Sequence, residues 1–298
     1  MNLLFFFKRI IIFSMKRIVT VFYLGFIMVF QFGYLGALEL ELSGGVNNMT
    51  LPPEKIAAGG EFEPFLYVFG SLSVKGEIDK AWGYKGTLQR DNILQNTADF
   101  RLITRTDYFS FEFGVFAGMI DAFEIPDAGI LGSIEVTWPG ILFFALEGSS
   151  TLGVQYNFSS DNKRETAGAR LGFWVPFAVF TLSAKTKSLT WYGGVPDPVT
   201  DSLLRFQLSA DIPFSKTSPF NLRIDAGYQT LKSEYTDETD EISSFFAGFD
   251  FQYTIKKSWG VFIGGEMPFL PKPKEPLKDS VQFWKMYKAH AGVKYKFK

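Results

Sequence analysis

The last stretch of the chain, residues 284–297, follows a two-residue repeat that few folds can use. One set of alternate positions is apolar: Tyr287, Ala289, Ala291, Val293, Tyr295 and Phe297. The other set is mostly charged or small: Met286, Lys288, His290, Gly292, Lys294 and Lys296. Because successive side chains of a β-strand point to opposite faces, the repeat predicts a strand with one apolar and one charged face. Aromatic residues near both ends of the apolar face are typical of a strand that crosses a membrane.

The same alternation recurs along most of the chain after residue 38, where no stretch has the 3.6-residue period of an amphipathic helix. Such runs, bounded by turn residues, predict β-strands. We place them near residues 38–48, 61–77, 82–91, 96–105, 108–122, 129–138, 141–156, 165–175, 177–191, 203–212, 220–234, 242–254, 259–269 and 282–297. This makes about 14 strands, an even number as in single-chain bacterial barrels. If the third and fourth strands are not separate, the alternative is about 12.

The links between these strands are of two kinds. Some are tight turn dipeptides between apolar runs: Thr106-Asp107, Pro139-Gly140, Val175-Pro176 and Lys256-Lys257. Others are longer and polar, at residues 157–165, 192–202, 234–241 and 270–280. Outer-membrane barrels join their strands by short periplasmic turns and longer extracellular loops. The sequence therefore predicts an all-β fold: a single antiparallel up-and-down transmembrane β-barrel over residues 38–298.

A soluble antiparallel β-sandwich is the alternative, since alternation alone does not say which face of a sheet meets water. Two features favour the membrane. Many of the expected strands are longer than the roughly five to six residues typical of soluble proteins. Glycine also recurs on the polar faces, where it weakens a solvent-facing strand but relieves crowding inside a narrow barrel. These glycines are Gly114, Gly118, Gly168, Gly172, Gly227, Gly248, Gly260 and Gly264.

The first 37 residues have the composition of a targeting segment. Met15-Lys-Arg17 is basic, residues 18–29 are apolar, and Leu35-Gly-Ala37 supplies small residues before a cut. We therefore expect a cleaved signal peptide over residues 1–37, with Met15 as the suspected true start, and a mature chain in the outer membrane. An uncleaved membrane anchor is the alternative, because the apolar run is long enough to span a bilayer.

Composition excludes several classes of protein. The chain has no cysteine, which rules out disulfides, thiolate metal sites and an acylated N-terminal cysteine. Its formal net charge of −1 gives no basis for binding nucleic acid. A Gly-rich phosphate cradle and loop-borne metal clusters are missing from the sequence. We therefore expect no cofactor and no metal.

The mature chain resembles the outer-membrane β-barrels of Gram-negative-type bacteria. Its last stretch is similar to their closing strand, which commonly ends on an aromatic residue, although here Lys298 follows Phe297. The short sequence segments 46–50, 90–96 and 106–109 are similar to segments of uncharacterised β-barrel proteins of treponemal-type spirochaetes. The resemblance implies contact with outer-membrane lipid, insertion by the barrel-assembly machinery and passage of small solutes. It implies no reaction.

Ionisable residues at inward-facing positions are the candidates for function, because rings of charge in a pore select ions and solutes. We expect the lumen to be lined by Arg101, Arg105, Glu112, Glu147, Arg170, Lys185, Arg205, Asp211, Arg223, Asp225, Asp250, Glu266, Lys288 and His290. A group of Arg170, Arg205 and Arg223 would suit small anionic solutes. The alternative is that charges pair across strands and fill the barrel. A barrel of about 14 strands lies between barrels of about 8 strands, which side chains fill, and barrels of about 16 strands, which leave an open channel.

Closure of the barrel requires the last strand to pair antiparallel with the first, because an open edge would leave backbone groups unpaired in the bilayer. Glu39 and Glu41 face inward on the first strand, and Lys294 and Lys296 face inward on the last. We therefore predict a seam with Lys296 near Glu39 and Lys294 near Glu41, within one two-residue step.

These patterns favour a narrow channel for small hydrophilic solutes. A surface barrel that anchors partner-binding loops, without a transport role, is the alternative. The loops, at about 6–12 residues, are near the usual connection length, which favours the channel. We expect no enzyme, because the sequence has a single histidine, His290, and lacks the Gly-x-Ser-x-Gly motif that presents a catalytic serine.

Overall fold

The computed structural model describes residues 38–47, 67–90, 96–120, 125–152, 163–191, 199–214, 218–234, 239–255, 258–273 and 287–297. These ranges hold fourteen strands: β1 Leu38–Asn47, β2 Tyr67–Glu77, β3 Trp82–Arg90, β4 Asn96–Arg105, β5 Phe109–Ile120, β6 Ile125–Trp138, β7 Leu142–Thr151, β8 Lys163–Val175, β9 Ala178–Trp191, β10 Val199–Pro213, β11 Phe220–Glu234, β12 Thr239–Ile255, β13 Trp259–Pro273 and β14 Lys288–Lys296. Outside the described residues lie the expected targeting segment, residues 61–66 of the second expected strand and the Lys256-Lys257 turn.

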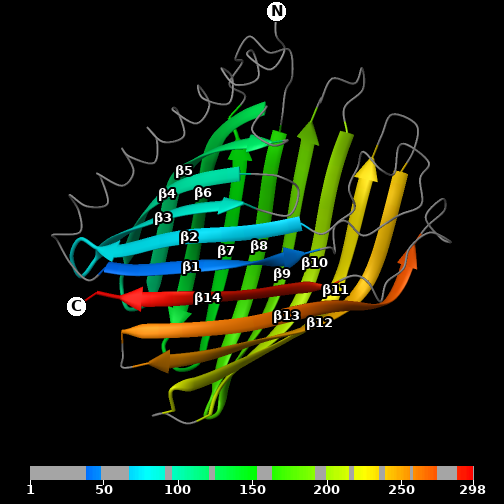
Figure 1. The fold of residues 1–298 in the computed structure, drawn as a ribbon. Helices are drawn as coiled ribbons and strands as arrows, with labels where there is room; N and C mark the ends of the chain where they lie inside the picture. Colours follow the sequence, from blue (N-terminus) through cyan, green and yellow to red (C-terminus); the bar gives the residue numbers. More distant parts are fainter. Residues whose placement is uncertain are drawn as a thin grey trace, which may run out of the picture.

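The strands form one closed antiparallel barrel, in which each strand pairs with its neighbours in the chain and β14 pairs with β1. Figure 1 shows β1 and β14 side by side, between β2 and β13. The predicted fold class and strand count are therefore confirmed for the described residues. The twelve-strand alternative is wrong, because β3 and β4 are separate partners, paired from Trp82 with Thr104 to Arg90 with Asn96.

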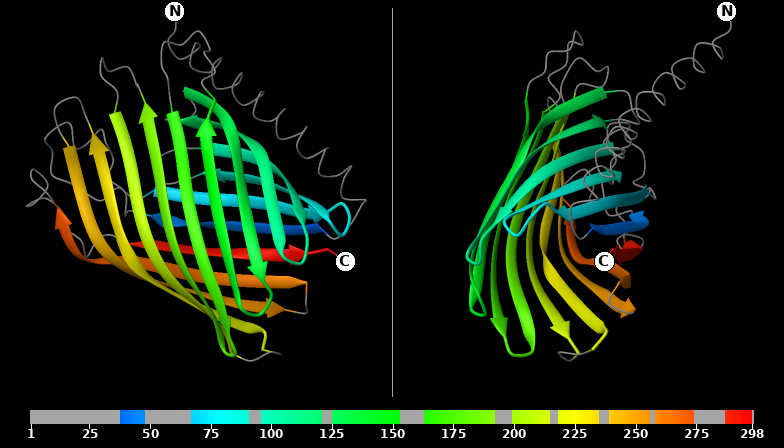
Figure 2. Two further views of the ribbon diagram at one scale, coloured as in Figure 1. Left: turned by 180° about the vertical axis from the view of Figure 1, so that it is seen from behind. Right: turned by 90° about the vertical axis from the view of Figure 1, so that its left-hand side faces the viewer.

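The strands are strongly tilted, as closure of a barrel requires. In Figure 1 the strands of the front wall, β1, β2, β13 and β14, run across those of the back wall. Seen from behind in Figure 2, β7 to β10 form a continuous curved wall. Since every strand has a partner on each side, the described barrel has no open edge strand.

One end of the barrel carries the tight turns. Between β6 and β7, the amide of Ile141 donates to the carbonyl of Trp138 at 2.9 Å. Gly140 has φ +74° and follows Pro139, which is the pattern of a type II turn. At Thr106-Asp107, the amide of residue 106 likewise donates across the turn, to the carbonyl of residue 109, at 2.7 Å. We call this end the tight-turn end, and the other the long-link end.

The outer face of the wall is apolar. On β5 the side chains of Phe111, Phe113 and Val115 are exposed, and Val115 keeps 59% of its surface. Alternate residues of β10 are exposed in the same way: Leu204, Phe206 and Leu208. Phe249 of β12 is 52% exposed. The alternation seen in the sequence therefore places a belt of large apolar side chains on the outside of the barrel.

Inward positions carry polar side chains and, in the described residues, five phenylalanines that each lie directly opposite a glycine of the next strand. The pairs are Phe69–Gly45, Phe116–Gly129, Phe143–Gly172, Phe246–Gly227 and Phe262–Gly292. A Cβ added to Gly129 or to Gly227 would lie 2.6 Å from the facing ring, and one added to Gly45 would lie 2.8 Å away. Each ring therefore occupies the space that a side chain would take at its glycine.

The interior is partly filled by apolar side chains. Phe246 is fully buried, and Ile103, Leu189 and Ile242 keep 1%, 2% and 2% of their surfaces. These residues belong to the inward-facing sets of their strands. Directly opposite residues share a face of the sheet: Ile103 lies opposite the inward Glu112, and Ile242 lies opposite the inward Leu231.

Candidate functional site

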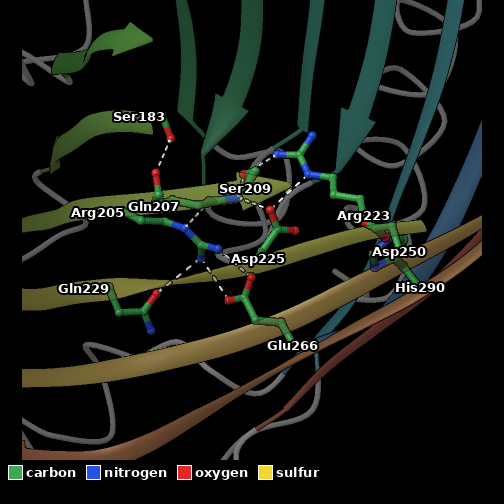
Figure 3. A network of polar contacts seen from close by, with 10 residues as sticks. All are labelled: Ser183, Arg205, Gln207, Ser209, Arg223, Asp225, Gln229, Asp250, Glu266 and His290. Atoms are coloured by element: carbon green, nitrogen blue, oxygen red, sulfur yellow. Dashed lines mark hydrogen bonds and ion pairs between the residues drawn. The ribbon is translucent and has the colours of Figure 1, made fainter. Parts of the chain in front are cut away.

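An arginine–glutamate pair crosses the interior of the barrel. Arg205 on β10 donates to the carboxylate of Glu266 on β13 with its two terminal guanidinium nitrogens, Nη1 at 2.9 Å and Nη2 at 2.5 Å. The contact passes over β11 and β12, which lie between the two strands. Side chains can meet across two strands on the concave face of a curved sheet, whereas on the convex face they diverge. The pair therefore fixes this set of positions as the inner face (Figure 3).

Arg205 is held on its other sides as well. Its guanidinium carbon lies 3.7 Å from the ring centroid of Phe246, within the range of a cation–π contact. Its Nε donates to Gln207 at 3.0 Å and its Nη1 donates to Gln229 at 3.3 Å. With side chains 20% and 12% exposed, Arg205 and Glu266 form a largely buried, bidentate ion pair.

A second polar group continues the network toward the tight-turn end. Arg223 pairs with Asp225 at 2.9 Å and donates to the hydroxyl of Ser209 at 3.0 Å. Asp225 also accepts from the amide of Gln207 at 2.7 Å, which joins this group to Arg205 (Figure 3). Asp211 lies directly opposite Arg223 in the sheet. This wall of the interior is therefore a connected network in which each arginine has its own carboxylate.

His290 lies at the side of this network. Its Nε2 is 2.6 Å from Asp250 Oδ1, and its ring stands between those of Phe69 and Phe262, with centroids at 6.5 Å and 6.3 Å. The ammonium of Lys288 lies 5.5 Å from the Phe69 ring. In the part of the chain that the structure describes, no group of three or more His, Asp or Glu side chains is arranged to hold a metal ion.

The opposite wall contains a cavity of about 250 Å³. Its lining comes from β3 to β9: Gln89, Thr97, Asp99, Arg101, Phe116, Leu131, Gly132, Glu147, Gly148, Ser149, Arg164, Thr166, Lys185 and Lys187. Arg101 pairs with Asp99 at 2.9 Å and with Glu112 at 3.5 Å. Lys185 pairs with Glu147 at 3.3 Å. The cavity is therefore polar and bordered by ion pairs.

The three arginines grouped in the sequence analysis do not form one cluster. Arg205 and Arg223 pair with Glu266 and Asp225, and Arg170 lies 3.7 Å from Glu135. Arg105 lies at the tight-turn end of β4, opposite Ser110. Arg205 and Arg170 therefore pair across strands, as the alternative for individual charges expects, whereas Arg223 pairs with a carboxylate of its own strand, β11.

The seam pairs the chain ends in the predicted register. Glu39 lies directly opposite Lys296, and Glu41 lies directly opposite Lys294. The ion pair runs diagonally, from Lys294 Nζ to Glu39 Oε1 at 2.8 Å, one two-residue step from the directly opposite pairs. The amide of Phe297 donates to the carbonyl of Leu38 at 2.7 Å, so the backbone ladder continues to the end of the described chain.

Sequence reasoning missed Arg164 and the inward phenylalanines. Arg164 was assigned to a polar link, but it is the second residue of β8, is 5% exposed and donates to Thr97 Oγ1 at 2.5 Å. Phe116 and Phe246 occupy inward positions that the alternation leaves to polar residues. An aromatic residue out of phase with its strand and opposite a glycine is the signal that would have found them.

Comparison with known proteins assigns no family. No family model matches the sequence, and no curated protein matches it. Solved structures similar to this chain include an outer membrane channel of Pseudomonas putida F1, at 9% identity over 88% of this chain and 95% of that one, with a TM-score of 0.46. A bacterial polysaccharide outer membrane secretin matches at 10% identity over 89% and 99%, with a TM-score of 0.46. OmpT of Vibrio cholerae lacking loop L8 matches at 10% identity over 88% and 97%, with a TM-score of 0.40. The resemblance to spirochaete barrels stays a prediction.

In the ranges that the structure describes, no helix is both long and apolar enough to cross a membrane.

Proposed function

We propose that the protein lies in the outer membrane and forms a narrow channel for small hydrophilic solutes. The membrane location is supported by the outer face, where side chains such as Phe113, Phe206 and Ile263 are about half exposed. A soluble protein rarely exposes a contiguous apolar surface of this extent. In a bilayer the same surface meets lipid, and the closed order of the described strands leaves no edge strand exposed.

The polar side chains of the interior are the observation that supports the channel proposal. The inner wall carries ionisable and hydroxyl side chains in hydrogen-bonded networks, and the strands from β3 to β9 line a polar cavity. Charged groups of this kind are stable in an interior that water enters. The long-link end would then face the outside and the tight-turn end the periplasm. Cleavage of residues 1–37 on export belongs to this proposal.

Single-channel recording in planar bilayers tests the channel directly. Protein refolded into lipid is expected to give discrete current steps in potassium chloride. The same protein after heat denaturation is the control and should give none. A folded, inserted barrel that produces no steps, in bilayers where a known porin does, would contradict the channel and leave the surface-anchor alternative.

A further inference from the structure

Two neighbouring turns at the tight-turn end are made of uncharged residues. The turn from β6 to β7 lies within residues 136–146, and the turn from β8 to β9 lies within residues 171–184. Neither stretch contains an Asp, Glu, Lys, Arg or His residue. The sequences that join the other strands at this end do contain charged residues: Asp79, Asp107, Lys216, Lys256 and Lys257. These two turns therefore differ in chemistry from the other links at this end.

The tips of the two turns carry large apolar side chains that are exposed. Phe177, in the turn from β8 to β9, keeps 65% of its surface, the largest fraction among the large apolar side chains of the described residues. Ile141, in the turn from β6 to β7, keeps 63%, and Trp138 at the end of β6 keeps 49%. Exposure of this much apolar surface to water is unfavourable. A contiguous apolar surface of this kind commonly marks contact with a partner or with a membrane.

The two turns lie side by side and form one surface. Their inner strands, β7 and β8, pair with each other. The amide of Trp174 donates to the carbonyl of Ile141 at 3.0 Å, which links one turn to the other. The ring of Trp174 also lies near that of Phe143, with centroids 5.4 Å apart. We call residues 138–142 and 173–178 the apolar lobe.

The backbone of the apolar lobe has few donors that need water. Pro139 and Pro176 have no N–H group. The N–H of Ile141 donates to the carbonyl of Trp138 at 2.9 Å, within the turn. The turn from β2 to β3 is built differently, because there the carboxylate of Asp79 accepts from two backbone amides at 2.7 Å each. Since unpaired donors and charged groups are costly in an apolar medium, the lobe can enter lipid at a lower cost than that turn.

The apolar lobe is continuous with the outer face of its own strands. Phe144 on β7, and Leu171 and Phe173 on β8, are exposed on that face. No ionisable residue separates these side chains from the tips at Ile141 and Phe177. The surface that meets lipid along the strands in the proposed membrane location therefore extends without interruption to the turns. Lipid is the partner that fits such a surface.

We propose that the apolar lobe is inserted into the lipid leaflet at the tight-turn end, at the boundary between headgroups and acyl chains, instead of standing in water. The inference rests on the membrane location proposed above and does not require that the barrel conduct. The lobe would fix how deeply β6 to β9 lie in the membrane, because withdrawing it would expose its apolar side chains to water. The charged turn from β2 to β3 would reach the aqueous phase.

Fluorescence quenching by spin-labelled lipid tests this position. Single cysteines replace Ile141 and Phe177 at the tips, Leu171 on the outer face of β8, and the exposed Lys80 in the turn from β2 to β3. Each cysteine is labelled with bimane in urea, and the protein is refolded into phosphatidylcholine vesicles. Half of the vesicles contain phosphatidylcholine with a nitroxide near the top of the acyl chain, the depth at which apolar faces lie in a membrane interface. The labels at Ile141→Cys and Phe177→Cys should be quenched at least about twofold more than that at Lys80→Cys.

Leu171→Cys and Lys80→Cys are the matched controls, for lipid and for water. The chain has no cysteine of its own, so each label reports one position, and if one tip variant does not fold the other decides. Tip labels quenched as weakly as Lys80→Cys, with Leu171→Cys strongly quenched, would overturn insertion of the lobe and leave the membrane location standing. Weak quenching at Leu171→Cys as well would contradict the membrane location, and the lobe with it.

Discussion

The side chain of Arg205 makes three kinds of contact: with a carboxylate, with an aromatic ring and with two amide side chains. A buried ion pair contributes little when compared with apolar residues of the same shape, but removing one partner leaves an uncompensated buried charge. Removal of Glu266 is therefore the more informative change, because Arg205 then keeps its charge and loses its only carboxylate contact among those described above.

Glu266→Gln is predicted to lower the free energy of unfolding by roughly 3 kcal/mol. The reason is that the guanidinium of Arg205 remains buried against Phe246 without a compensating charge. Urea titration of the barrel in lipid vesicles, followed by tryptophan fluorescence, measures the change.

Glu165→Gln provides the control for this prediction. Its ion pair with Lys163 is exposed, with side chains 46% and 58% accessible, so its loss should change stability by less than about 0.5 kcal/mol. Similar losses in both variants would mean that Arg205–Glu266 is solvated like a surface pair. In conducting protein, Glu266→Gln should also move the reversal potential toward anion selectivity.

The pairing of each inward phenylalanine with a glycine is a property of neighbouring strands. Phe246 on β12 lies over Gly227 of β11, and the guanidinium of Arg205 on β10 lies over the Phe246 ring. The glycine allows the ring to lie along the wall, where it supports the guanidinium. Glycine on these polar faces was expected to relieve crowding, and at Gly227 it makes room for one particular ring.

Gly227→Ala is predicted to destabilise the barrel by about 1–3 kcal/mol, because the new Cβ would overlap the Phe206 carbonyl and the Phe246 ring. Gly260→Ala, also at an inward position, is the matched control. A Cβ there would meet its nearest atoms at 3.6 Å or more, so this variant should be neutral or slightly stabilising. Equal stability of the two variants in the same titration would show that the ring moves freely.

Strand positions and faces could be predicted from the sequence because each strand has one apolar and one polar side. β4 and β11 begin and end at the predicted residues. The partners of Arg205 and Arg164 could not be predicted, since these side chains reach residues several strands away. Those contacts depend on tilt and curvature, which the alternation of a single strand does not contain.

The closing seam determines whether the whole molecule is a barrel. Cysteines in place of Glu41 and Lys294, which lie directly opposite each other on β1 and β14, should form a disulfide in the folded protein, because directly opposite residues bring their Cβ atoms close enough. Non-reducing gel electrophoresis after mild oxidation detects it, and the chain contributes no cysteine of its own.

The register gives this prediction its control. Cysteines at Leu42 and Lys294 are offset by one residue, so their side chains point to opposite faces and should not form a disulfide. Efficient formation of the offset disulfide, or none in the directly opposite pair, would show a different seam.

In the channel that we propose, the polar face of the whole barrel lines an aqueous interior while the apolar face meets lipid. Thr166 on β8 lines the cavity, and Thr186 on β9 lies on the outer face beside Leu204. Each is replaced by cysteine in protein inserted into lipid vesicles and exposed to a charged, membrane-impermeant thiol reagent. Thr166→Cys is predicted to react and Thr186→Cys to stay unlabelled until detergent is added, since a charged reagent does not enter the bilayer. Labelling of Thr186→Cys in intact vesicles, with Thr166→Cys protected, would contradict the assignment of the two faces.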